Sequence, residues 1–134
     1  MSNETAVLIH QAVCALLDTN RYEDAFLLSE VICRGRPDYA DAYFNASLAL
    51  FHLGRFSESK AFMQRGPDSL WLKAETHYQM ACVEVALANL ELAVSFAEKA
   101  AAIHPRLLKA MIEDTDLKPI WTKIGRPKDR AEAK

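Results

Sequence analysis

Three stretches decide the fold of this chain and follow one another at equal intervals: Asn20-Arg21-Tyr22-Glu23, Gly54-Arg55-Phe56-Ser57 and Ala88-Asn89-Leu90-Glu91. Two of them begin with a residue that tolerates a tight turn, Asn20 or Gly54. Each continues with an aromatic or leucine side chain that can pack between the two helices of a hairpin. A small residue follows three positions further on, where paired helices would pack closely: Ala25, Ser59 and Ala93. The regular spacing predicts an internal repeat.

Between these stretches the chain is rich in good helix formers, and its apolar residues recur with helical spacing. No alternating run of β-branched residues bounded by a hairpin turn predicts a strand. The few Gly and Pro residues divide the chain into segments of helical length. The sequence therefore predicts an all-α fold with helices near 4–18, 21–34, 39–53, 55–64, 69–87, 89–103, 106–113 and 116–124.

The repeated pattern resembles the tetratricopeptide repeat family. The motifs that carry the resemblance are Leu53-Gly54-Arg55-Phe56-Ser57-Glu58 and Asn20-Arg21-Tyr22-Glu23-Asp24-Ala25, and the third unit carries Ala97-Glu98-Lys99-Ala100-Ala101 before Pro105. The resemblance implies a right-handed superhelical array of antiparallel helical hairpins. It also implies one domain, with the parts placed as follows: repeats at about 6–39, 40–73 and 74–107, capping helices at 108–124, and a basic flexible tail at 125–134.

Two units depart from the pattern. Gly66-Pro67 is expected to shorten the second helix of the middle unit, and Asp68 or Ser69 can then cap a fresh helix. Glu84 stands where the other units have Leu16 and Leu50, so either one packing site is polar or the register shifts locally.

Composition excludes several classes of protein. The chain has 134 residues, with 16 basic and 18 acidic side chains and a net charge of -2, so no dominant nucleic-acid-binding charge is present and no nucleic-acid partner is expected. Three cysteines do not form a secreted disulfide framework. The first residues lack the basic region of a signal peptide, and no apolar stretch approaches the length of a membrane span. We expect a cytoplasmic protein.

In a repeat array of this kind, the first helix of each hairpin lines an inner, concave face that binds partners. The repeat register places the following candidates there: His10, Phe44, Asn45, Leu48, Phe51, His52, Tyr78 and Gln79. The aromatic residues would form an apolar floor with acidic residues around it. The alternative is that Phe44 and Phe51 are core residues covered by the C-terminal helices.

Some members of the family bind a partner's C-terminal carboxylate through Lys, Asn and Arg on the first helices. Asn45 matches one of these positions, but Glu75 stands where a basic residue is needed and would repel a carboxylate. We therefore do not expect binding of that kind.

Catalytic motifs are absent from the sequence: it has no phosphate-binding Gly-rich loop, no Gly-x-Ser-x-Gly and no His-Glu-x-x-His. A non-enzymatic protein without a cofactor is therefore predicted. The contrasting hypothesis is a metal-binding protein that uses His10, Cys14, His52 and Cys82, although paired short cysteine spacings are missing. Asp114 or Asp116 is more simply a helix cap than part of an acidic site.

Basic residues outnumber acidic ones, five to two, in the last twelve residues. The basic residues are Lys123, just before the predicted tail, and Arg126, Lys128, Arg130 and Lys134 within it. Such a tail is either a solvated chain end or an electrostatic contact for an acidic polymer or an anionic membrane.

The leading hypothesis is an adaptor that binds a protein or peptide segment in the concave groove. The resemblance allows a kinesin-light-chain-like adaptor, which links an acidic cytoskeletal polymer or membrane to a partner, or a secretion-type chaperone that sequesters a subunit. Self-assembly through exposed hairpin faces is a third possibility.

Overall fold

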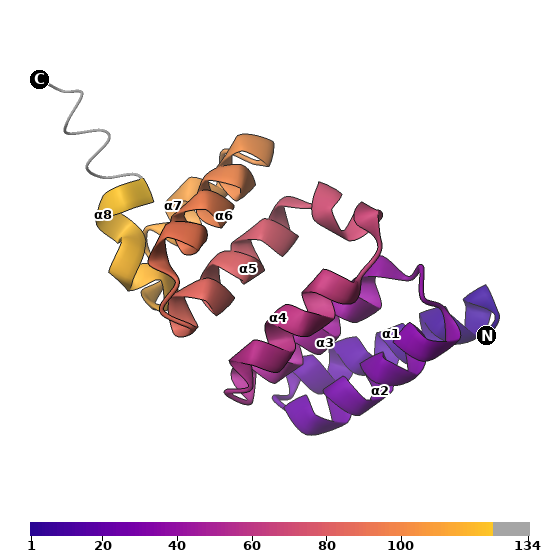
Figure 1. The fold of residues 1–134 in the computed structure, drawn as a ribbon. Helices are drawn as coiled ribbons and strands as arrows, with labels where there is room; N and C mark the ends of the chain where they lie inside the picture. The colour runs from indigo at the N-terminus through magenta and orange to yellow at the C-terminus, as the bar shows by residue number, and fades with distance from the viewer. Residues whose placement is uncertain (125–134) are drawn as a thin grey trace, which may run out of the picture. The chain divides into compact units, whose positions relative to one another are not determined.

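The computed structural model describes residues 1–124, and every element in that range is helical. The chain forms two compact units, Met1–Leu70 and Trp71–Lys134. In the first unit, α1 (Asn3–Asp18) pairs with α2 (Tyr22–Gly35), and α3 (Ala40–His52) pairs with α4 (Phe56–Arg65), while α2 and α3 also pack together (Figure 1). The predicted all-α fold of helical hairpins is confirmed.

The second unit is built on one further hairpin, α5 (Ala74–Ala86) and α6 (Leu90–Ile103). It continues through α7 (Leu107–Met111), the 3₁₀ helix η2 (Thr115–Ile120) and α8 (Trp121–Ile124), which pack against the hairpin or against one another. The boundary between the units falls within a short 3₁₀ helix, η1 (Asp68–Leu72). The predicted division into repeats at 6–39, 40–73 and 74–107 stays a prediction.

The three hairpin turns share one backbone conformation. Asn20, Gly54 and Ala88 have φ angles of 61°, 78° and 65°, in the left-handed region. In each turn the next residue's N–H donates to the carbonyl five positions earlier, from Arg21 to Leu16, Arg55 to Leu50 and Asn89 to Glu84. This hydrogen bond is typical of a helix that ends on a left-handed residue. The turn therefore recurs at the constant interval that the sequence predicts.

Ala88 is the least favourable residue among the three turns, because a Cβ atom is strained at positive φ whereas glycine is not. Ala88→Gly is expected to raise the free energy of unfolding by about 1 kcal/mol. The matched variant Gly54→Ala should lower it by a similar amount. Chemical denaturation of both variants checks the prediction, and a change of the same sign in both would contradict it.

Small residues are buried where the paired helices meet. Ala25, Ser59 and Ala93, which the sequence aligns, have no exposed surface. Ser59 keeps the site compact because its hydroxyl lies 2.6 Å from the Ser47 hydroxyl and donates to the Ser47 carbonyl at 2.8 Å. A serine in this position is therefore satisfied rather than disruptive.

The middle hairpin loses one helical turn. The helix α4 has 10 residues, whereas α2 and α6 have 14, and it ends before Gly66 as predicted. The predicted single helix over 69–87 is wrong, because η1 ends at Leu72 and Lys73 is extended before α5 begins at Ala74. The starts of α3 at Ala40 and α5 at Ala74 are as far apart as the turns at Gly54 and Ala88, so the repeat interval is restored after the shortened helix.

The C-terminal helices are also shorter than predicted. The segment predicted as 106–113 is helical only over Leu107–Met111, and 116–124 is a 3₁₀ helix followed by one α-turn. Pro119 cannot donate a backbone hydrogen bond, which disfavours a continuous α-helix there. Asp114 caps η2 by accepting from the Asp116 N–H at 2.9 Å, so the predicted capping role is confirmed.

The register does not shift at Glu84. The Glu84 side chain is almost fully buried at the position of Leu16 and Leu50, and its Oε1 accepts from the Asn89 amide at 2.8 Å. The packing site is therefore polar, which was one of the two alternatives. The predicted basic tail at 125–134 lies outside the described residues, apart from the neighbouring Lys123, which is exposed.

Candidate binding surface

Two of the predicted residues, His10 and Asn45, lie together between α1 and α3 of the first unit. His10 on α1 lies with its Nδ1 3.3 Å from the Asn45 amide nitrogen on α3 and its Nε2 3.6 Å from the Cys14 sulfur. One neutral tautomer satisfies both contacts, because Nδ1 can accept from Asn45 while Nε2–H donates to sulfur. The Tyr39 ring lies 5.8 Å from the imidazole ring. His10, Cys14 and Asn45 therefore form a polar cluster between α1 and α3.

Acidic side chains lie near this cluster. The pKa of the Cys14 thiol is raised by burial first and then by the negative charges of Asp18 and Asp41. Cys14 is exposed to solvent, so the carboxylates that act on it lie near the same exposed surface. The sequence predicted acidic residues around an apolar floor, whereas Asp18 and Asp41 act here on a polar cluster, and the groove itself stays a prediction.

The aromatic candidates lie in two different settings. Phe44 and Leu48 on α3 are half-buried, so part of each side chain remains accessible. Phe51 packs edge-on against Phe56, and His52 stacks on the Tyr22 ring at 4.6 Å. Phe51 and His52 are thus held beside the hairpin turns by contacts that the repeat register did not reveal.

Tyr78 and Gln79 lie on α5 in the second unit. The Tyr78 hydroxyl donates to Asp114 at 2.7 Å, and the pKa of Tyr78 is raised by burial and by this carboxylate. Gln79 is buried, and its Nε2 has no hydrogen-bond partner among the described residues. The C-terminal segment therefore engages Tyr78 directly.

The metal-binding hypothesis gains no support from the arrangement of these side chains. Within residues 1–124, the one group with ligand atoms close enough for a metal is Cys82, Asp114 and Asp116, with atoms within 4.8 Å of one another, and it includes neither His10 nor His52. Burial and the two carboxylates raise the pKa of the Cys82 thiol, which disfavours the thiolate that metals bind. Both Asp114 carboxylate oxygens already accept hydrogen bonds.

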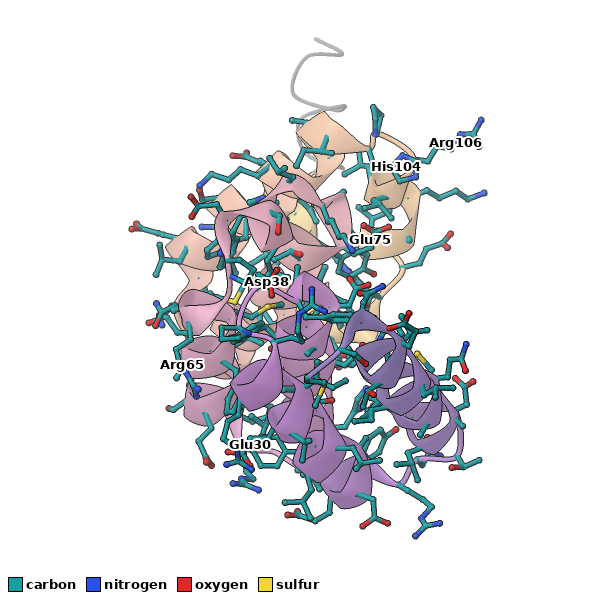
Figure 2. The ribbon with its side chains drawn as sticks, turned by 90° about the vertical axis from the view of Figure 1, so that its right-hand side faces the viewer. Glu30, Asp38, Arg65, Glu75, His104 and Arg106 are labelled. Atoms are coloured by element: carbon teal, nitrogen blue, oxygen red, sulfur yellow. The ribbon has the colours of Figure 1, made fainter. Side chains whose placement is uncertain are left out.

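Two arginines at the start and the end of α4 pack on aromatic rings of the first unit. Arg65 on α4 lies over the Phe62 ring at 4.5 Å, and Figure 2 labels it together with Glu30 of α2. Arg55 is held by Glu58 at 2.7 Å and lies over the Phe26 ring at 5.3 Å. These contacts fix the outer surface of the first unit.

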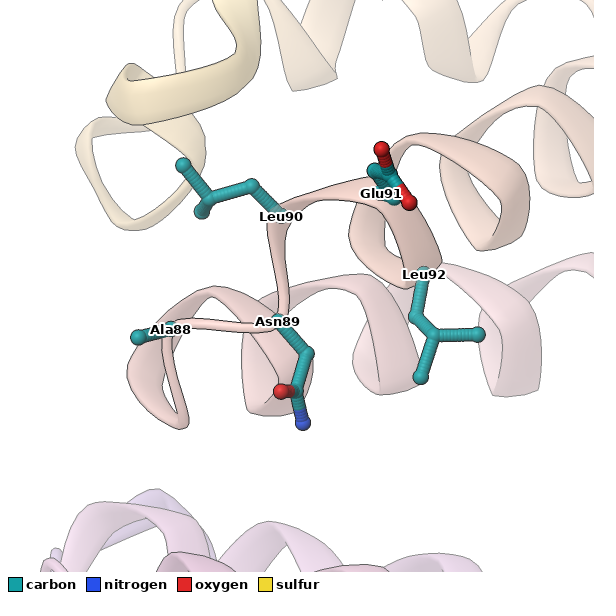
Figure 3. A pocket seen from close by; sticks show the side chains of 5 residues that line it. All are labelled: Ala88, Asn89, Leu90, Glu91 and Leu92. Carbon is teal, nitrogen blue, oxygen red and sulfur yellow. The ribbon is translucent and has the colours of Figure 1, made fainter.

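A pocket lies at the turn between α5 and α6, where residues 88–92 line it (Figure 3). Glu91 is its one ionisable side chain, and the remainder of the lining is apolar or amide. A single carboxylate without a second acid, base or nucleophile does not form a catalytic site.

Hairpins of paired helices whose turns recur at a fixed interval define a helical repeat protein. Residues 40–66, which span α3 and α4, match the family model described as tetratricopeptide repeat, and this match supports the resemblance to that family. Such repeats are typically non-catalytic modules for protein–protein interaction. No curated protein and no solved structure matches the chain. Among the helices of residues 1–124, none has both the length and the apolar character needed to cross a bilayer.

Several contacts were missed by the sequence analysis. The stacking of Tyr22 on His52 joins residues on neighbouring hairpins, and the Tyr78–Asp114 hydrogen bond joins a repeat to the segment after it. A repeat alignment compares equivalent positions in different repeats. It therefore gives no signal for a contact that occurs at one place in the chain and is not repeated.

Proposed function

We propose that the protein is a non-enzymatic adaptor that binds a segment of a partner protein on the inner face of α1 and α3. The observation that carries this proposal is the polar cluster of His10, Asn45 and Cys14 on the same pair of helices as the half-buried Phe44. An apolar anchor would pack on Phe44, and polar groups of the partner would meet the cluster.

The chemistry of the surface specifies the kind of partner. Asp18 and Asp41 place negative charge beside the cluster, so a segment with an apolar side chain and basic neighbours complements it. Tyr78 and Gln79 were predicted to extend the groove, but the Tyr78 hydroxyl is engaged by Asp114. The proposal therefore rests on the residues of the first unit.

Affinity capture with a matched pair of variants tests this proposal. Phe44→Glu places a charge on the inner face, whereas Leu27→Glu places one on the exposed outer surface of α2. Partners of the inner face should be recovered with wild-type protein and Leu27→Glu and lost with Phe44→Glu, as identified by mass spectrometry. Equal recovery with both variants would contradict the proposal.

A kinesin-light-chain-like role would add a second contact through the basic tail, in a cytoplasmic setting. What supports this part of the proposal is composition: residues 123–134 contain five basic and two acidic side chains. A secretion-type chaperone would need the inner face alone, so the tail distinguishes the two roles.

Removal of residues 126–134 is expected to weaken binding to vesicles of anionic phospholipid by at least about tenfold, since each basic residue near a membrane contributes about 1 kcal/mol. The deletion removes four basic and two acidic side chains. Co-sedimentation at low salt, with neutral vesicles as the control, measures the effect. Equal pelleting of full-length and truncated protein would eliminate the tail as a membrane contact.

A further inference from the structure

The C-terminal segment of the second unit lies against the positions of α5 that the repeat register assigns to the inner face. A shift by one repeat carries Phe44 and Leu48 of α3 onto Tyr78 and Cys82 of α5. The Tyr78 hydroxyl donates to Asp114 at 2.7 Å, and an oxygen of Asp114 lies within 4.8 Å of the Cys82 sulfur. These two inner positions of α5 are therefore occupied by the protein's own chain.

Apolar side chains anchor this segment after Asp114. Leu117 and Ile120 have no exposed surface, and both belong to η2, which packs against α5. The bound segment thus combines one carboxylate with apolar side chains three and six positions further on. We call residues 114–120 the covering segment.

The covering segment depends on the hairpin of α5 and α6 for its structure. The elements α7, η2 and α8 have 5, 6 and 4 residues, and helices of this length are not stable alone in water. In contrast, α5 and α6 have 13 and 14 residues and pack on each other. The covering segment thus belongs to the part of the second unit with the least structure of its own, and such parts open locally before a unit unfolds.

We infer that the covering segment is an internal competitor for a second partner site, on the inner face of α5. The partner is a protein segment of the same pattern, in which Asp or Glu is followed three and six positions on by Leu or Ile. Tyr78 donates to the partner's carboxylate as it donates to Asp114, and the partner's apolar side chains take the places of Leu117 and Ile120. Binding requires displacement of the covering segment, so the chain itself regulates access to this site.

The two inner faces select different segments. The helix α3 has Phe44 where α5 has Tyr78, so no hydroxyl donates to a carboxylate from that position. Glu75 lies one turn before Tyr78, but it is exposed, so water and salt screen its charge. The site on α5 uses residues of the second unit alone, and it stands independently of the surface proposed on α1 and α3.

A labelled synthetic peptide of residues 112–124, titrated into the full chain by fluorescence anisotropy, tests the inference. Leu117→Ala combined with Ile120→Ala weakens the covering segment and leaves α5 unchanged. The peptide should bind this double variant with a dissociation constant at least about tenfold lower than that for wild type, because its internal competitor is weaker. Addition of Tyr78→Phe should raise the dissociation constant again by at least about threefold, since the peptide's carboxylate loses its donor.

Ile32→Ala is the matched control, because it removes a fully buried side chain from the first unit. It should leave the affinity for the peptide at the wild-type value, and circular dichroism checks that all variants are folded. Equal affinity for wild type and the double variant, or an equal gain with Ile32→Ala, would overturn the inference.

Hydrogen exchange of the wild-type chain tests the opening without any substitution. The amides of residues 115–124 should exchange together and faster than those of α5 and α6, although the Leu117 N–H donates to the Asp114 carbonyl at 2.9 Å. Exchange of both groups at one common rate would show that the covering segment leaves α5 only when the whole unit unfolds, and the inference would then be wrong.

Discussion

Leu50→Glu is expected to lower the free energy of unfolding by about 3–5 kcal/mol, the cost of a buried charge without a partner. Leu50 has no exposed surface, and the residue five positions on is Arg55, whose guanidinium is held by Glu58 at 2.7 Å and 2.8 Å. In the middle unit Arg55 takes the place that Asn89 has in the third unit, so no neutral amide is there to donate to the new carboxylate. Far-UV circular dichroism during urea unfolding measures the loss.

The matched variant is Glu84→Leu, which restores the residue type of the other two units at the same repeat position. Asn89 is exposed, so water can replace its hydrogen bond to Glu84. Replacing a buried polar group by a well-packed apolar one is often neutral or stabilising. A loss of more than about 2 kcal/mol on Glu84→Leu, or no loss on Leu50→Glu, would contradict the equivalence of these positions.

Trp121→Ala should lower the free energy of unfolding of the second unit by about 3 kcal/mol. The indole Nε1–H donates to the Met111 carbonyl at 2.9 Å and to the Asp114 carbonyl at 3.0 Å, so one side chain joins α7 to the start of η2 and α8. Its loss removes both contacts and the packing of a large ring.

The two tryptophans make this measurement specific, because Trp71 and Trp121 both lie in the second unit. In Trp121→Ala the fluorescence of Trp71 alone reports unfolding of that unit. Trp121→Phe, which keeps a ring but not the N–H donor, should cost about 1 kcal/mol. An unchanged midpoint for Trp121→Ala would show that the C-terminal segment is not held in this way.

Much of the fold could be predicted from the sequence because the same residue pattern occurs in it three times. The turns at Asn20, Gly54 and Ala88 were aligned by residue type, and their shared left-handed backbone follows from the same register. Burial of Ala25 and Ala93 follows in the same way, since only small residues fit where helices cross closely.

What could not be predicted lies where the repeat stops or departs from its pattern. The extended Lys73 separates a 3₁₀ helix from α5, and apolar spacing gives no signal for a break of one residue. Asp114 could be assigned a capping role locally, but its bond to Tyr78 depends on how the C-terminal segment folds back on α5. The contact of His10 with Asn45 likewise depends on how α1 and α3 pack against each other.

The measurement that tests the proposed function most directly compares the affinity and stability of one variant, Phe44→Ala. A partner segment recovered by capture is titrated into wild-type and variant protein by calorimetry, and both proteins are unfolded in urea. If Phe44 is an anchor on the inner face, affinity falls at least about tenfold while the free energy of unfolding changes by about 1 kcal/mol or less. A loss of about 3–5 kcal/mol in stability with unchanged affinity would show that Phe44 is a core residue and contradict the proposed site.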